Sequence, residues 1–161
     1  MIYHCCDQLR RNAVDAHATL NGIDYLEVVD NDAPTFELRQ RTLLVRLLKP
    51  MPASLNKAQV RIEGGERVRD IGIEWIAPAS APPASVSAAE LALYDALPEP
   101  DHVLLVRVDA YGDHSSYTLR LVRSALDDTP PPGFDPRLAE IAFSFKVECP
   151  SDFDCKRVVV C

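Results

Sequence analysis

The amino-acid sequence predicts a mostly β fold, an antiparallel β-sandwich of about seven strands with an immunoglobulin-like shape and one or two short helices. Three observations support this prediction. Short runs of residues alternate between apolar and polar side chains, with the period of two that is typical of strands. Glycine and proline separate these runs, and few segments carry helix signals. Strands with one apolar face must bury those faces against each other, and two packed sheets do so.

The N-terminal part begins with a predicted helix over residues 7–16, with one side formed by Leu9, Ala13 and Ala16. The pattern becomes strand-like after Asn21 and Gly22. Strands are predicted over residues 23–29 and 42–48, and the second must end before Pro50, because proline cannot donate to a ladder.

The next two predicted strands cover residues 60–63 and 68–76, which alternate between apolar and polar side chains. The pair Gly64-Gly65 lies between them. Because a tight hairpin turn needs positive φ at its central positions, this pair predicts a hairpin that joins the two strands. The pair lacks the Lys-Ser/Thr of a phosphate-binding loop, so a nucleotide site is not indicated.

A loop rich in alanine and proline covers residues 77–86. The sequence Ser87-Ala88-Ala89-Glu90 then forms a capping box, which predicts the start of a short helix that reaches about Leu97. Pro98 and Pro100 end this helix.

The C-terminal part predicts a second hairpin, with strands over 103–109 and 117–122 around a turn at 111–113, and a last strand over 141–148. The alternating apolar side chains predict the core of the sandwich: Val60, Ile62, Ile71, Ile73, Trp75, Leu119, Leu121, Ile141, Phe143 and Phe145. One domain over 1–148 and a cysteine-containing tail or linker over 149–161 are therefore expected.

The charge balance argues against two classes of partner. The chain has 17 Lys and Arg residues against 24 Asp and Glu residues, a net charge of −7. Nucleic acid and anionic membrane surfaces need a basic face, so neither is an expected partner. No export signal or bilayer-length apolar run is visible in the sequence, which predicts a cytosolic product without membrane insertion.

The five cysteines are the strongest chemical candidates: Cys5, Cys6, Cys149, Cys155 and Cys161. An odd number in a chain without an export signal favours reduced thiols over a disulfide framework. Three or four thiolates that join the two chain ends would suit zinc or an iron–sulfur cluster, with four of the five at most as ligands. The alternative is that they are free cysteines that pack as small apolar residues.

No catalytic signature stands out. The segment Asp113-His114-Ser115 contains the residue types of a hydrolase triad, but adjacent residues cannot converge into that relay, and Asp and Ser are typical of a turn. The spacing of His4, His17 and His102 predicts no metal site, and the acidic pairs near 30–32 and 127–128 lack the oxygen donors of a calcium loop.

Several blocks together resemble the N-terminal region of the baseplate assembly proteins (baseplate J-like family) of contractile, phage-tail-like injection systems. They comprise residues 3–7, 20–28, 60–65, 117–122, 133–136 and 143–155. The last block, with Cys149 and Cys155, is the most specific. Relatives are longer and continue into a J-like body, so this chain is expected to be either a fragment of such a protein or a separately encoded head domain, and to end about where that body would begin.

The resemblance implies a non-enzymatic structural protein of the baseplate. Its implied partners are other wedge proteins, spike or hub proteins and further copies of itself. It would be cytoplasmic during assembly and then part of a particle that is released or membrane-anchored. The alternative function is a metal-binding module whose thiolates join the chain ends.

Overall fold

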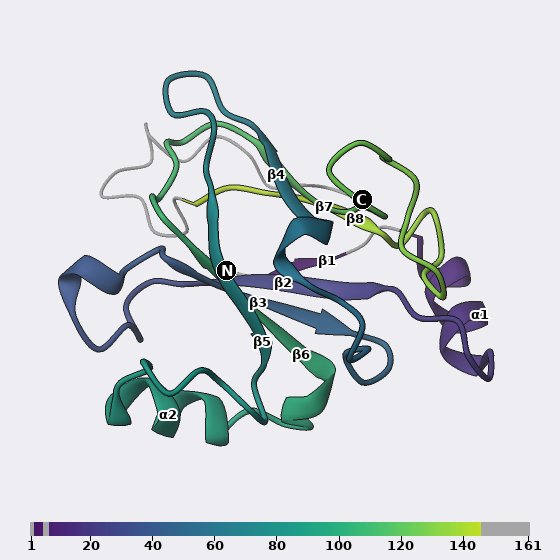
Figure 1. Cartoon of the computed structure of the whole chain (residues 1–161), viewed down its shortest axis with the longest axis horizontal. Coiled ribbons are helices and arrows are strands. Elements are labelled where there is room, and N and C mark those ends of the chain that lie inside the picture. Colours follow the sequence, from purple (N-terminus) through teal and green to yellow (C-terminus); the bar gives the residue numbers. More distant parts are fainter. Residues whose placement is uncertain (1, 5–6, 146–161) are drawn as a thin grey trace.

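The computed structural model describes residues 2–4 and 7–145, which form two antiparallel sheets and two short α-helices (Figure 1). The large sheet has the strand order β1-β2-β3-β6-β5, and the small sheet has the order β4-β7-β8. The strands are β1 (Ile2–His4), β2 (Ile23–Val29), β3 (Thr42–Leu47), β4 (Val60–Gly64), β5 (Ile73–Pro78), β6 (Val103–Val108), β7 (Tyr117–Leu121) and β8 (Glu140–Phe143). The predicted mostly β sandwich is confirmed, and β1 is an addition to the predicted strands.

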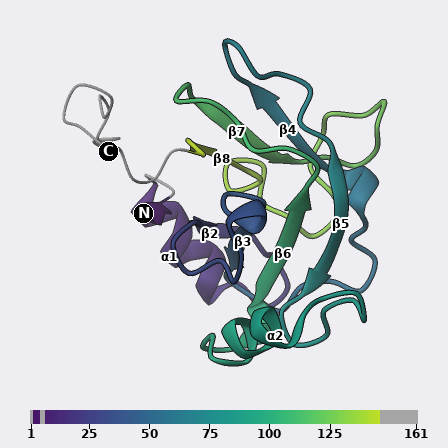
Figure 2. The same cartoon turned by 90° about the vertical axis from the view of Figure 1, so that its left-hand side faces the viewer.

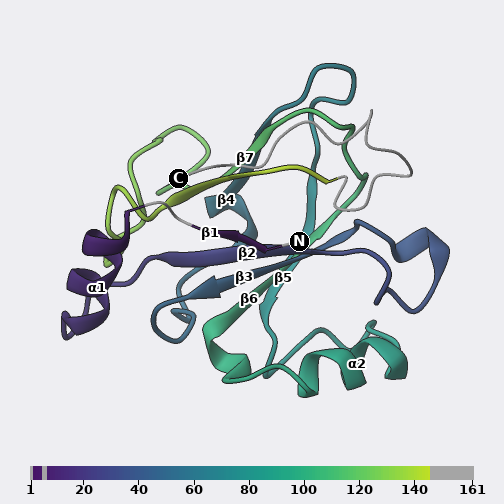
Figure 3. The same cartoon turned by 180° about the vertical axis from the view of Figure 1, so that it is seen from behind.

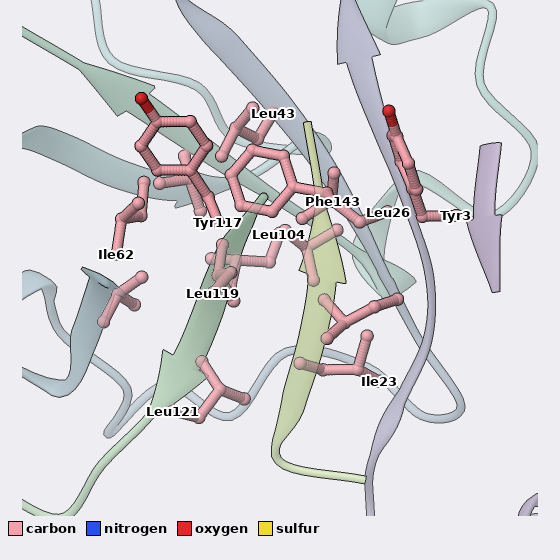
Figure 4. Close-up of a cluster of buried hydrophobic side chains, with 14 of the residues drawn as sticks. Tyr3, Ile23, Leu26, Leu43, Ile62, Leu104, Tyr117, Leu119, Leu121 and Phe143 are labelled. Carbon is pink, nitrogen blue, oxygen red and sulfur yellow. The ribbon is translucent and has the colours of Figure 1, made fainter. Parts of the chain in front are cut away.

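The core of the sandwich lies between the two sheets (Figure 4). Leu43, Leu104 and Leu119 are fully buried there, and the rings of Tyr117 and Phe143 lie 6.0 Å apart between them. All residues of the predicted core are buried except Ile73 and Trp75, which are partly buried. Alternation in β4, β7 and β8 therefore identified the inward face of the small sheet.

The large sheet is covered on both faces in its centre. Leu104 and Val106 of β6 belong to the core between the sheets, whereas Val103 and Leu105 pack in a second cluster with Tyr94 of α2 (Ala88–Asp95). Figure 1 shows α2 on the far side of the large sheet from the small sheet. A strand between two apolar layers is apolar at successive positions, as β6 is. Trp75 belongs to the layer beside α2, which explains why it is missing from the main core.

Both helices form where they were predicted. Asp7 caps α1 (Gln8–Ala16) by accepting a 2.9 Å hydrogen bond from the Arg10 amide, and Ser87 and Glu90 form the capping box of α2. Within residues 2–4 and 7–145, neither helix has the length and apolar character needed to cross a bilayer.

The predicted apolar side of α1 is wrong. Leu9 is 84% exposed, Ala13 and Ala16 are also exposed, and Val14 is the buried residue of this helix. The helix is held instead by polar contacts, because Arg10 and Arg11 reach carboxylates on the sheet side. Apolar spacing alone could not identify a face that packs through guanidinium groups.

Both predicted hairpins are also wrong. β4 pairs with β7, and β5 pairs with β6, so the chain crosses from the small sheet to the large sheet after Gly64 and Gly65. It crosses back between β6 and β7. Gly65 does have a positive φ of 84°, but a Cβ there would also collide with the Val68 carbonyl of the same loop and with the Tyr117 ring of β7, so glycine is needed for these close approaches.

The remaining boundaries differ in part from the prediction. β5 begins at Ile73 rather than 68, and β8 ends at Phe143. Phe145 is nevertheless fully buried and contacts the rings of Tyr117 and Phe143 at 5.0 Å. The predicted boundary between residues 148 and 149 lies outside the described residues.

Candidate functional site

One side of the sandwich is closed by aromatic side chains. β1, at the edge of the large sheet, lies beside β8, at the edge of the small sheet (Figure 3). Tyr3 donates a 3.1 Å hydrogen bond from its hydroxyl to the Ser144 carbonyl, and its ring meets Phe143 edge-on at 6.3 Å. These contacts join the edges of the two sheets on this side.

The other side, where β4 and β5 are the edge strands, carries an open groove of about 520 Å³. We call this the β4 groove. Its lining includes Val60 and Ile62 of β4, Ile71 just before β5, Ile73 at the start of β5, and the loop residues Leu126 and Asp128. Leu126 is 99% exposed at the rim. An apolar groove beside a free strand edge can receive an extended segment of another chain.

The outer face of the small sheet is charged and internally paired. Arg61 of β4 bonds to Glu63 at 3.2 Å and to Asp128 at 2.7 Å, and these hydrogen bonds raise its pKa. Arg120 of β7 contacts Glu140 of β8 at 2.8 Å. The surface of this face is therefore a row of alternating charges rather than an apolar patch.

A carboxylate joins the two loops that cross between the sheets. Asp113 accepts hydrogen bonds from the backbone amides of Arg67, at 2.7 Å, and Val68, at 3.0 Å. It also accepts one from the Ser115 amide at 2.8 Å, and Tyr117 donates to the Val68 carbonyl at 2.7 Å. Desolvation would raise the pKa of Asp113, but the hydrogen bonds from the Ser115 hydroxyl and from the Ser115, Val68 and Arg67 amides outweigh it and hold the pKa well below its usual range.

This geometry gives Asp113-His114-Ser115 a structural role. The Ser115 hydroxyl donates to Asp113 and accepts a 3.0 Å hydrogen bond from the Glu66 amide. His114 is exposed. In a catalytic triad the acid orients the histidine, and the histidine contacts the nucleophilic serine. Here Asp113 accepts the hydrogen bond from Ser115 directly.

Two ion pairs with buried carboxylates, which the sequence analysis did not predict, anchor the helices. Glu90 of α2 pairs with Arg107 of β6, both nearly fully buried, and the Arg107 guanidinium lies 5.2 Å from the ring of Trp75. Desolvation would raise the pKa of Glu90, but hydrogen bonds from Ser87 and Arg107 lower it. The signal in the sequence was an arginine inside the otherwise apolar run of β6.

Asp135 anchors α1 through a second ion pair. Its side chain is fully buried and contacts Arg10 at 2.6 Å. Desolvation would raise the pKa of Asp135, but the hydrogen bond from Arg10 and those from the Arg137 and Leu138 amides lower it. Both buried carboxylates are therefore satisfied by partners and serve packing.

The predicted thiolate cluster cannot be placed, because Cys5, Cys6, Cys149, Cys155 and Cys161 all lie outside the described residues. Within residues 2–4 and 7–145, no three His, Cys, Asp or Glu side chains group as metal ligands would. His17 accepts hydrogen bonds from the Thr19 and Leu20 amides at the end of α1. The zinc or iron–sulfur site stays a prediction.

Comparison with known proteins identifies a family. A family model described as "Phage baseplate assembly protein, N-terminal domain" matches residues 1–143. No curated protein and no solved structure matches the chain significantly. The matched range contains both sheets, both helices and the β4 groove with its rim.

Proposed function

Because the chain belongs to the family of phage baseplate assembly protein N-terminal domains, we propose that it acts by docking on neighbouring subunits of a contractile baseplate. The family supports a structural role in a phage baseplate and points to a non-enzymatic function. It also implies interaction with other baseplate proteins. The docking surface is our proposal.

The observation that carries the docking proposal is the contrast between the two sides of the sandwich. Tyr3 and Phe143 close one side, whereas the β4 groove opens beside a free strand edge on the other. An edge strand offers N–H and C=O groups that a partner strand can complete, and Leu126 adds an apolar contact at the rim.

The partners that we propose are the other wedge proteins and the spike or hub proteins around which the wedges are arranged. Assembly would take place in the cytoplasm, before the particle is released or anchored at a membrane. An acidic domain with net charge −7 suits contacts with proteins better than contacts with nucleic acid.

The test is deletion of this domain from the protein in which it occurs, followed by electron microscopy of the particles. We expect unassembled particles or incomplete baseplates. Normal, fully contractile particles would contradict the proposal.

A point variant locates the surface. Leu126→Asp places a charge at the rim of the β4 groove and should reduce baseplate incorporation, whereas Leu9→Asp, at another highly exposed leucine on α1, should not. Equal incorporation of both variants would remove the groove from the proposal.

A further inference from the structure

Within residues 2–4 and 7–145, β4 pairs with β7 alone, and its other edge, which we call the free edge, has a defined hydrogen-bonding pattern. The Gln59 carbonyl accepts from the Val122 amide at 2.8 Å, and the Gly65 amide donates to the Ser116 carbonyl at 3.2 Å. In an antiparallel ladder, alternate residues bond to the same neighbouring strand. The odd-numbered residues of β4 therefore bond to β7, and the N–H and C=O groups of Ile62 point to the free edge.

The side chains around Ile62 have a second pattern. Ile62 points into the core, whereas its neighbours Arg61 and Glu63 lie on the outer face with side chains 29% and 42% exposed. The charges flanking Ile62 are thus opposite in sign. Such a strand is complementary to a copy of itself that runs in the reverse direction.

We propose that two copies of this domain associate edge to edge through β4, antiparallel and centred on Ile62. In this register the Ile62 N–H and C=O groups of the two copies bond reciprocally. Arg61 of each copy then lies opposite Glu63 of the other. The two small sheets join into one continuous sheet across a two-fold axis, which is the symmetry of most protein dimers.

Charge selects this register over its neighbours. A strand pair centred on Arg61 or on Glu63 places like charges opposite each other, which destabilises a sheet. In the pair centred on Ile62, the opposed ions occupy the positions without reciprocal hydrogen bonds, where side chains approach most closely. The pattern therefore favours a second copy over an arbitrary strand.

The position of β4 gives the second copy access. The β4 groove lies along this edge, and β4 and β5 are on the opposite side of the molecule from α1 and β1 (Figure 2). At the other edge of the small sheet, β8 lies beside β1. The inference names one partner for the docking proposed above and rests on that proposal for its place in the particle.

The test is sedimentation of the 161-residue chain over the micromolar range. We expect a monomer–dimer equilibrium whose dissociation constant rises with salt concentration. Glu63→Arg and Arg61→Glu each replace attraction by repulsion at both symmetric contacts, so each should raise the dissociation constant at least about tenfold. An equimolar mixture of the two variants should associate again, because an acidic edge then meets a basic edge.

Glu140→Arg is the matched control. It makes the same charge change on the outer face, at the other edge of the small sheet, and should leave the dimer intact. Hydrogen exchange adds an independent readout, since the Ile62 amide should become protected as concentration rises.

A chain that stays monomeric would overturn the inference, as would a dimer that Glu63→Arg and Glu140→Arg affect equally. Capture of a strand from another baseplate protein by β4, without self-association, would also overturn it. None of these results bears on the baseplate role, which the domain deletion tests separately.

Discussion

The hydroxyl of Tyr3 donates a 3.1 Å hydrogen bond to the carbonyl of Ser144, 141 positions further along the chain. Burial raises the pKa of Tyr3, so the hydroxyl is protonated and can donate at neutral pH. Tyr3 belongs to the large sheet, and Ser144 follows the last strand of the small sheet. The contact therefore ties the sheets together on one side, whereas the side with the edge strands β4 and β5 carries the open groove.

Phe143→Ala should lower the free energy of unfolding by about 3–5 kcal/mol, because a large cavity in the core remains unfilled. Phe143 is 2% exposed and contacts the rings of Tyr3, Tyr117 and Phe145. Denaturant unfolding of the purified chain measures the change. Phe36→Ala is the control, since Phe36 is 80% exposed and its loss should cost no more than about 0.5 kcal/mol. Equal losses of unfolding free energy for the two variants would contradict the placement of Phe143 in the core.

Glu90→Gln should destabilise the domain by about 3–5 kcal/mol, since it leaves the buried Arg107 guanidinium without a counter-charge. The same measurement on Glu74→Gln gives the comparison. Glu74 pairs with Arg41, but its side chain is 43% exposed, so this loss should cost about 0–1 kcal/mol. A loss below about 1 kcal/mol for Glu90→Gln would show that the buried pair does not hold α2.

The stability of the domain should fall as the pH drops below about 4. Hydrogen bonds hold the pKa of Asp113 below its value in an unfolded chain, despite desolvation. A carboxyl with a depressed folded pKa stabilises the fold above its unfolded pKa, and this contribution disappears as the pH falls toward the folded value. Asp113→Asn should therefore be less stable than the wild type at neutral pH and lose less on acidification. Parallel pH curves for the two proteins would contradict this.

Elemental analysis tests the thiolate cluster. Protein purified without chelator or metal-affinity resin should carry close to one equivalent of zinc or an iron–sulfur cluster, held by up to four of Cys5, Cys6, Cys149, Cys155 and Cys161. Cys149→Ser and Cys155→Ser should each release it. Less than about a tenth of an equivalent, with all five thiols freely reactive in the native protein, would leave them as ordinary cysteines.

Local signals in the sequence predicted most elements correctly. Alternation identified the strands at 23–29, 60–63 and 117–122 to within about one residue. The capping box at Ser87 and Glu90 identified the start of α2. These signals succeed because strand alternation and helix capping depend on residues that are close in the chain.

The candidate site was less predictable. The edge of β4 was hidden by the hairpin that Gly64-Gly65 suggested, and the loop contact through Asp113 resembled a turn. Arg61 and Glu63 were visible in the sequence as the polar positions of a strand. Whether they can contact a partner chain depends on which strand pairs with β4, and the sequence did not give that pairing.

The sequence by itself determined that this is a β-rich domain with short helices at 7–16 and 87–97, and its blocks identified the baseplate family. Only the tertiary structure decided which strands pair, which side of the sandwich is closed and which face of α1 is buried. Backbone hydrogen bonds are the same for every pair of strands, so alternation cannot choose among partners. That choice depends on contacts between distant residues, such as Tyr3 with Phe143 and Tyr117 with Val68.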